Sequence, residues 1–418
     1  MSPTAHGLGW WAAGALLLAS LVAGCLGDAP QDQGANDAGP GGAAGHPDSG
    51  RSGSGGGSGS GSSSGGSFGG DGGTVTGDAE GPAGDAGIKL GAAAPCKASG
   101  TFGAGMTMFA CVPTGLEGKT GQPVPLVVAM HGYTQGAYQQ PASGQPATPK
   151  WGYVTTTQWA VLAEAYKFYV VFADTGPGAP SFQWYSSPSR GDIQSSAIVA
   201  MVDAMKQAHT IDASRVYANG LSSGAFMTVV MLAEYPDVFA GGSTFEGGAY
   251  GCTESCAALG KQGQGWTWPG NHPASSVVDA YPTVWSDPGA RKPSLLVFQG
   301  EKDGAVTPEN MADLVQQWSG ALGIPATSAN AALGISTTLK GQQYTVYAKG
   351  GQVQLATVFM PGIGHGTPVD PGPGSDQGGW DPMPSKTMVN DPNLVQDWTN
   401  TAGIWGVYYS ARFWGLVP

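Results

Sequence analysis

The sequence predicts an α/β fold in which a mostly parallel central sheet is covered by helices on both faces. From residue 96 onward, short apolar runs of strand length alternate with longer runs at helical spacing. This alternation is typical of parallel strands joined by crossover helices. One strand, at 216–219, leads directly into a Gly-Leu-Ser-Ser-Gly turn and then a long apolar helix. Ligands of such sheets bind at the carboxyl ends of the strands, which is where this turn should lie.

The elements can be assigned in chain order. Strands are expected at 125–130, 169–173, 216–219, 242–245, 294–298, 344–348 and 355–360. Helices are expected at 159–166, around 198–205, at 225–235 and at 404–414. One more helix should follow Thr307 as its N-cap, with Pro308 at its first position and Met311, Leu314, Val315 and Trp318 on its buried face.

Three segments are expected along the chain. Residues 1–24 have the character of a lipoprotein-type signal peptide, and 25–90 are a Gly- and Ser-rich stretch with almost no large apolar side chains. Such a stretch cannot bury enough apolar surface to offset its chain entropy, so it is expected to be a disordered tether. Residues 91–418 are rich in aromatic and apolar runs, and they predict one folded domain.

The signal segment ends in Leu-Val-Ala-Gly-Cys at Cys25, which resembles the bacterial lipobox, where the cysteine is lipidated. The alternative is a plain secretion signal with an incidental cysteine. We therefore expect an exported protein that is either an outer-surface or outer-membrane lipoprotein or fully extracellular. Membrane contact is expected only through this lipid, and a monomer is expected.

The other four cysteines are even in number, which in an exported chain predicts two disulfides. Three pairings are possible, and we expect the local one, which joins Cys96 with Cys111 and Cys252 with Cys256. Metal binding by these cysteines is not expected in an oxidising compartment, and neither a metal ion nor a cofactor is expected elsewhere.

The charge balance argues against nucleic acid as a partner. The 418 residues carry 17 Lys and Arg against 29 Asp and Glu, a formal net charge of −12. Binding to phosphates requires clustered basic residues, and the sequence has no such cluster.

Ser222 is the predicted nucleophile. A serine at the centre of Gly-x-Ser-x-Gly between a strand and a helix sits on a sharp turn, a nucleophile elbow, that exposes its hydroxyl. The same pattern occurs at 61–65 and 65–69, but no strand or helix flanks those copies. An ordinary glycine-rich turn is the alternative for the copy at Ser222.

A serine hydroxyl needs a neighbouring base and a carboxylate that orients this base. In hydrolases with this turn, the chain order is serine, acid, histidine. Of the six histidines, His365 follows the expected strand 355–360 and lies between glycines, so it is the predicted base. Asp303 and Glu301, in the loop after strand 294–298, are both candidates for the acid.

Two backbone N–H groups are expected to hold the oxyanion of the transition state. One belongs to Ser223, directly after the nucleophile. The other belongs to Tyr133, in the His-Gly-Tyr loop that follows strand 125–130. His131 in this loop is expected to be structural.

These motifs, in this order, resemble the polyhydroxybutyrate depolymerase-like esterases, a family that also holds feruloyl and acetylxylan esterases. The resemblance is carried by 125–136, 211–217, 220–224, 234–240, 300–306, 361–371 and 411–416. It implies an α/β-hydrolase fold and hydrolysis of carboxylic esters through an acyl-enzyme. It also implies catalytic roles for Ser222, Asp303 and His365, and so selects Asp303 over Glu301.

The substrate is less closely defined. Polyhydroxyalkanoate polymer or oligomers are the first expectation, and feruloyl or acetyl esters of plant polysaccharide the second. A serine peptidase of the same fold and a non-catalytic adhesion module are further alternatives. The aromatic side chains of Trp184, Tyr185, Trp266 and Trp268 are candidates for substrate binding, or else are partly buried loop anchors.

Overall fold

The computed structural model describes residues 90–119, 121–137, 152–176, 181–184, 189–252, 272–324, 334–379 and 399–418. The expected signal peptide and nearly all of the expected tether lie outside these residues, so both remain expectations. Tyr185, Cys256, Trp266 and Trp268 also lie outside them. Among the helices that the structure describes, none is both long and apolar enough to span a membrane.

A ten-stranded sheet forms the centre of the domain, in the order β1-β2-β4-β3-β5-β6-β7-β10-β9-β8. The six strands from β4 to β10 in this order pair in parallel, and the strands at both edges pair antiparallel. The mostly parallel sheet expected from the sequence is therefore confirmed. Its carboxyl edge carries the loops after β3, β5, β7 and β10, which hold Tyr133, Ser222, Asp303 and His365.

The strands of this sheet are β1 Cys96–Thr101, β2 Thr107–Cys111, β3 Val124–Met130, β4 Tyr169–Asp174, β5 Ile211–Leu221, β6 Gly241–Phe245, β7 Ser294–Gly300, β8 Gly334–Leu339, β9 Gln342–Lys349 and β10 Gln352–Met360. A short parallel pair joins β11 Thr367–Val369 to β12 Thr399–Thr401. The helices are α2 Tyr153–Thr157, α3 Trp159–Tyr166, α4 Ile193–Ala208, α5 Ser223–Glu234, α6 Ala274–Ala280, α7 Pro282–Trp285, α8 Glu309–Leu322 and α9 Gly406–Phe413.

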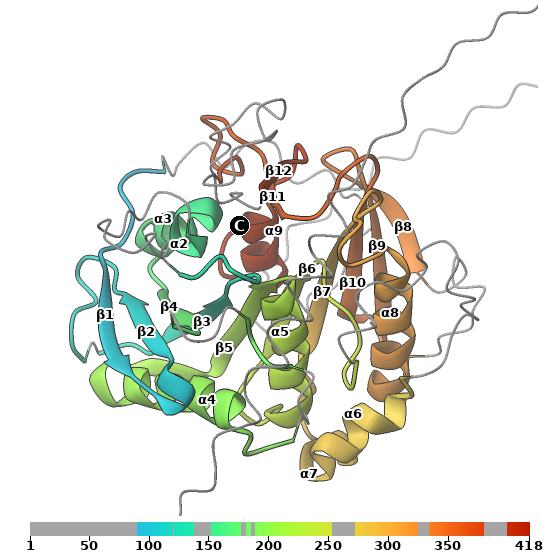
Figure 1. Ribbon diagram of the computed structural model, residues 1–418, viewed down its shortest axis with the longest axis horizontal. Coiled ribbons are helices and arrows are strands. Elements are labelled where there is room, and N and C mark those ends of the chain that lie inside the picture. Colours follow the sequence, from blue (N-terminus) through green and yellow to red (C-terminus); the bar gives the residue numbers. More distant parts are fainter. Residues whose placement is uncertain are drawn as a thin grey trace, which may run out of the picture. The chain divides into compact units, whose positions relative to one another are not determined.

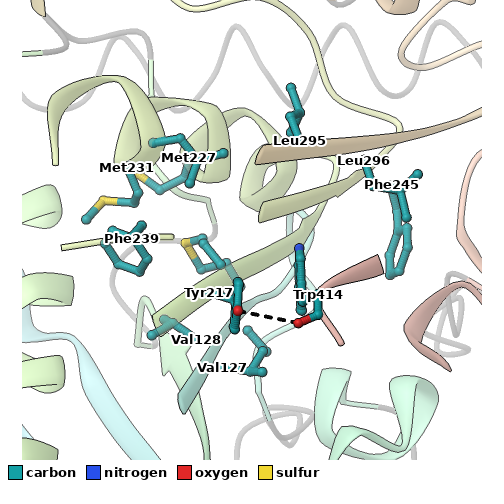
Figure 2. Packing of buried hydrophobic residues seen from close by; sticks show 14 of the residues in the cluster. Val127, Val128, Tyr217, Met227, Met231, Phe239, Phe245, Leu295, Leu296 and Trp414 are labelled. Atoms are coloured by element: carbon teal, nitrogen blue, oxygen red, sulfur yellow. Dashed lines mark hydrogen bonds between the residues drawn. The ribbon is translucent and has the colours of Figure 1, made fainter. Parts of the chain in front are cut away.

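The helices form two groups about the sheet (Figure 1), with α3 and α9 in one and α4, α5 and α8 in the other. Aromatic stacking fixes the first group to β5, because Trp414 lies between Trp159 and Tyr217. Its ring centroid is 5.9 Å from that of Trp159 and 4.7 Å from that of Tyr217, with nearly parallel planes. Figure 2 shows Tyr217 beside Trp414, with Met227 and Met231 of α5 elsewhere in the same apolar core.

Asn219 is a buried polar residue that ties β5 to its surroundings. Its Oδ1 accepts hydrogen bonds from the Tyr153 hydroxyl and from Trp159 Nε1, both at 2.9 Å. Its Nδ2 donates to Ser243 Oγ on β6 at 2.8 Å. A buried polar side chain with all of these partners specifies one register of the strand, and so fixes the turn that follows it.

The apolar runs of the sequence located the central elements, and α3 coincides with its expected range. The strand β5 and the helix α4 each begin five residues earlier than expected. The helix after Thr307 begins at Glu309 with Pro308 as N-cap, one residue later than expected. The sequence did not indicate β1, β2, β8, β11, β12, α2, α6 or α7, which are mostly short or lie at the sheet edges. Edge strands are half exposed, so their side chains lack the long apolar run of a buried strand.

The expected disulfide between Cys96 and Cys111 is present and joins β1 to β2 at directly paired positions. Cys252 is also disulfide-bonded. Its expected partner, Cys256, lies outside the described residues, so this second pairing remains a prediction.

Candidate active site

Ser222 lies on a strained turn between β5 and α5. Its backbone has φ 54° and ψ −117°, a conformation that costs a non-glycine residue about 1–3 kcal/mol. Its N–H donates to the Phe245 carbonyl of β6 at 2.9 Å. The side chain is partly exposed at the carboxyl edge of the sheet. This is the geometry of an elbow that exposes a serine hydroxyl above an α/β sheet.

The two glycines of the motif are required by close packing. A Cβ atom at Gly220 would overlap the Gly224 carbonyl, and a Cβ at Gly224 would overlap the carbonyls of Met130 and His131. The start of α5 therefore lies directly against the end of β3. This contact brings the turn that carries Ser222 beside the loop that carries Tyr133.

The loop after β3 is held as a tight turn. Gln135 N–H donates to the Gly132 carbonyl at 3.2 Å, and Gly132 N–H donates to Gln135 Oε1 at 3.1 Å. Tyr133 lies inside this turn. Ser223 is the first residue of α5, where backbone N–H groups have no acceptor within the helix. The two N–H groups expected to bind an oxyanion thus belong to adjoining segments.

His131 is buried and held by its own neighbours. Its Nδ1 donates to the Gly132 carbonyl at 2.7 Å, and its Nε2 accepts from Thr175 N–H at 3.2 Å. An Nε2 that accepts a hydrogen bond carries no proton, so the ring is neutral. Burial also favours the neutral ring, because it lowers the pKa of His131, although the charge of nearby Asp174 acts in the opposite direction. These contacts are those of a structural histidine.

Asp303 and His365 come together from the loops after two neighbouring strands, β7 and β10. His365 Nδ1 donates to Asp303 Oδ2 at 2.7 Å. The other oxygen of Asp303 accepts the N–H groups of Ala305 and Val306, each at 2.8 Å. The carboxylate is buried and fully paired, while the imidazole stays partly exposed.

Glu301, the other candidate acid, binds the backbone of the loop before His365. Its Oε2 accepts the Gly362 N–H at 2.8 Å, and its side chain is 42% exposed. It therefore supports the loop before His365 from the solvent side. Gln299 supports the acid turn from inside, because its Nε2 donates to the Val306 carbonyl at 3.0 Å.

A continuous set of contacts joins the serine to the histidine loop. Ser222 N–H binds the Phe245 carbonyl, and the next residue, Glu246, accepts the Gly366 N–H through Oε2 at 3.2 Å. Gly366 directly follows His365. The serine, the histidine and the acid therefore share one corner of the carboxyl edge, with the expected oxyanion donors beside them.

Comparison with known proteins places this geometry in a family. Residues 116–336 match the family model described as "Esterase PHB depolymerase", which is more than half of the chain. The chain belongs to the PHB depolymerase esterase family. It is a carboxylic ester hydrolase with the α/β-hydrolase fold that the sequence predicted.

Its relatives include proteins named as a polyester depolymerase and as acetylxylan esterases. The esterase is 34% identical over 332 residues to poly(3-hydroxyalkanoate) depolymerase C of Paucimonas lemoignei, covering 76% of this chain and 69% of the relative. It is 28% identical over 281 residues to a probable acetylxylan esterase A of Aspergillus fumigatus, and the match covers 65% of this chain and 68% of the relative. Among solved structures, acetyl xylan esterase from Aspergillus awamori matches 65% of this chain and 93% of its own at 24% identity, with a TM-score of 0.51.

Trp184 lies in the core of the esterase. It is 8% exposed and stacks on Phe226 of α5, with ring centroids 4.9 Å apart. This is the buried anchor that the sequence left open as the alternative to substrate binding, so Trp184 is not included in the site. The other three aromatic candidates lie outside the described residues.

Glu246 is a site residue that the sequence analysis missed. It directly follows β6, between the elbow and His365 in the sequence, as the candidates Glu301 and Asp303 follow β7. Glu246, Asp303 and His365 each offer an atom within 4.8 Å of the others, a set that a metal ion can use. In the esterase, however, Asp303 and His365 use theirs to bind each other.

Proposed function

We propose that the esterase is an exported serine hydrolase that cleaves polyhydroxyalkanoate polymer or oligomers through an acyl-enzyme. The observation that carries the mechanism is the 2.7 Å hydrogen bond from His365 to buried Asp303, on the same edge of the sheet as the elbow serine. Support for the substrate class is the identity of 34% with the Paucimonas lemoignei depolymerase.

Acylation begins when Ser222 Oγ attacks the ester carbonyl carbon and its proton passes to His365 Nε2. Asp303 holds the Nδ1 proton, so Nε2 carries no proton and can act as the base. The N–H groups of Ser223 and Tyr133 donate to the oxyanion of the tetrahedral intermediate. When the intermediate collapses, the bond to the alcohol oxygen breaks and His365 returns the proton to that alcohol.

Deacylation repeats these steps with water. His365 Nε2 takes a proton from water as the oxygen attacks the acyl carbon, and the same N–H groups hold the second oxyanion. Collapse breaks the bond to Ser222 Oγ, which recovers its proton from His365. The free acid then leaves.

The second candidate is hydrolysis of acetyl or feruloyl esters of plant polysaccharide. Its support is the acetylxylan esterase relative, which matches a similar length of the chain at 28% identity. Both candidates use the same acyl-enzyme chemistry and differ only in the acyl and alcohol groups.

A substrate panel tests this order. The purified chain is assayed on p-nitrophenyl butyrate, hydroxybutyrate oligomers, acetylated xylan, methyl ferulate and a set of peptides, with Ser222→Ala as the control. We expect Ser222-dependent turnover, with kcat/KM for the oligomers at least about tenfold above that for methyl ferulate. Selectivity factors of this size correspond to roughly 1–2 kcal/mol of transition-state binding. A preference for ferulate or acetylated xylan reverses the order, and turnover of peptides alone refutes the ester substrates.

We also propose that the chain reaches the cell surface as a lipoprotein acylated at Cys25. The motif Leu-Val-Ala-Gly-Cys after an apolar segment is the support for this. Cells that express the protein are grown with radiolabelled palmitate. The label should appear on the wild type and be lost in Cys25→Ala, whereas an unlabelled wild type contradicts the anchor.

A further inference from the structure

One buried carboxyl group of the site has no part in the mechanism above. Glu246 lies at the end of β6 with 0% of its surface exposed and with φ 53°, an uncommon conformation for a residue with a side chain. Its N–H binds the Phe298 carbonyl at 3.0 Å, which fixes its backbone to β7. The side chain points to the histidine loop, where Oε2 accepts the Gly366 N–H at 3.2 Å. Oε1 is buried and has no hydrogen-bond partner in the described part of the chain.

The charges around Glu246 are unfavourable for a second carboxylate. Asp303 and His365 each have an atom within 4.8 Å of its carboxyl group, and the buried phenol of Tyr153 is another titratable group that interacts with it. Asp303 is the charge partner of His365, so that imidazole is already paired. Burial, and then the charge of Asp303, raise the pKa of Glu246 well above its usual value, against the opposing effect of the backbone N–H groups of Gly366 and Gly300.

We infer that Glu246 is a positioning residue for His365: it holds the histidine loop through the Gly366 N–H as a neutral acid and adds no second negative charge beside the imidazole. This inference deepens the proposed function and rests on the proposed role of His365. The residues on both sides of His365 are glycines, which have no side chains that could hold the loop. The Glu246 contact restrains the residue directly after His365, and Asn400 Nδ2 restrains the residue before it by donating to the Gly364 carbonyl at 2.9 Å.

The neutral state matters for the base. A carboxylate within about 4–6 Å of a basic group favours the protonated form of that group by about one to three pH units. An ionised Glu246 would therefore keep His365 protonated to higher pH and move the acid limb of the kcat/KM profile upward. A neutral Glu246 restrains the loop without this effect.

Two substitutions in the full chain separate these roles. Glu246→Gln keeps an oxygen for the Gly366 N–H and carries no charge, so kcat should stay within about threefold and the acid-limb midpoint within about 0.3 pH unit. Glu246→Met keeps the length and removes the acceptor. It should lower kcat by about 10–100-fold with KM changed less than about threefold, because a displaced base slows the chemical step. The substrate for both is p-nitrophenyl butyrate.

Glu234 provides a matched control. It is a buried glutamate at the far end of α5, about 18 Å along the helix from Ser222, and its Oε1 accepts from the Tyr250 hydroxyl at 3.3 Å. Burial raises the pKa of Glu234 to about 7. A carboxyl group whose pKa is higher in the folded than in the unfolded protein contributes stability at pH values below its unfolded pKa, near 4.5. This contribution is lost as the pH rises through the folded pKa. Both Gln variants should therefore gain Tm over the wild type as pH is raised from about 5 to about 9, and Glu234→Gln should leave the kcat/KM profile unchanged.

The inference is overturned if the acid limb of Glu246→Gln falls by about one pH unit or more, since Glu246 would then be ionised. It is also overturned if Glu246→Gln loses activity as Glu246→Met does, or if Glu246→Met keeps full kcat. Should Glu246→Met fail to fold, the profile of Glu246→Gln alone decides. The wild type and Ser222→Ala are assayed alongside, because loss of Ser222-dependent turnover is the failure of the proposed function and not of this inference.

Discussion

Replacing Ser222 by alanine should lower kcat for p-nitrophenyl butyrate by roughly four to six orders of magnitude, with KM nearly unchanged. The substitution removes the atom that forms the bond to the substrate acyl group. The oxyanion donors are backbone N–H groups, so they remain and sustain a small residual rate above that of water. Alanine is also compatible with the packing of the turn, because the side chain at this position is partly exposed.

Ser214→Ala is the matched control for this result. Ser214 is an exposed serine on the same strand, β5, and its hydroxyl donates to Asp212 at 2.6 Å. It should keep full activity within about twofold, and both variants should have the Tm of the wild type within about 2 °C. If Ser222→Ala retains more than about one thousandth of the wild-type kcat, Ser222 is not the nucleophile.

The elbow could be found from the sequence because its requirements are local. Gly220 and Gly224 are needed by contacts within the turn and with the end of β3, where any Cβ atom overlaps a carbonyl group. Such a requirement leaves a fixed spacing in the sequence, and the flanking strand and helix distinguish this copy from the two in the glycine-rich segment. The expected order of serine, acid and histidine along the chain then left His365 as the candidate base among six histidines.

Glu246 shows why the rest of the site could not be found in this way. Nothing in the sequence says that its carboxyl group turns inward, since that depends on a positive φ at the end of β6 and on the position of Gly366. For Trp184 the sequence left two alternatives open, substrate binding and a buried anchor. A tryptophan in a loop is equally compatible with a cleft and with the core, and the packing of Phe226 against it decides the matter. Both are tertiary properties that local patterns do not encode.

Replacing Asp303 by asparagine should lower kcat by about three to four orders of magnitude while leaving the fold intact. The reason lies in how the acid turn uses the two carboxylate oxygens. Oδ1 accepts the Ala305 and Val306 N–H groups, and Oδ2 accepts the His365 Nδ1 proton. Asparagine has one oxygen, and the two backbone donors will hold it. Its NH₂ group then faces His365 and donates to Nδ1. The ring proton is therefore on Nε2, and a protonated Nε2 cannot accept the proton of Ser222.

Glu301→Gln is the control that distinguishes the two candidate acids. The glutamine side chain would still offer an oxygen to the Gly362 N–H, so kcat should change less than about threefold. If Glu301→Gln costs more activity than Asp303→Asn, the acid has been assigned to the wrong residue. The size of the Asp303→Asn effect also measures how much the carboxylate contributes through the protonation of His365. A neutral isostere with the same shape and the same backbone partners removes the negative charge that selects the tautomer of His365 and stabilises its protonated form, so the loss of rate measures these two effects together.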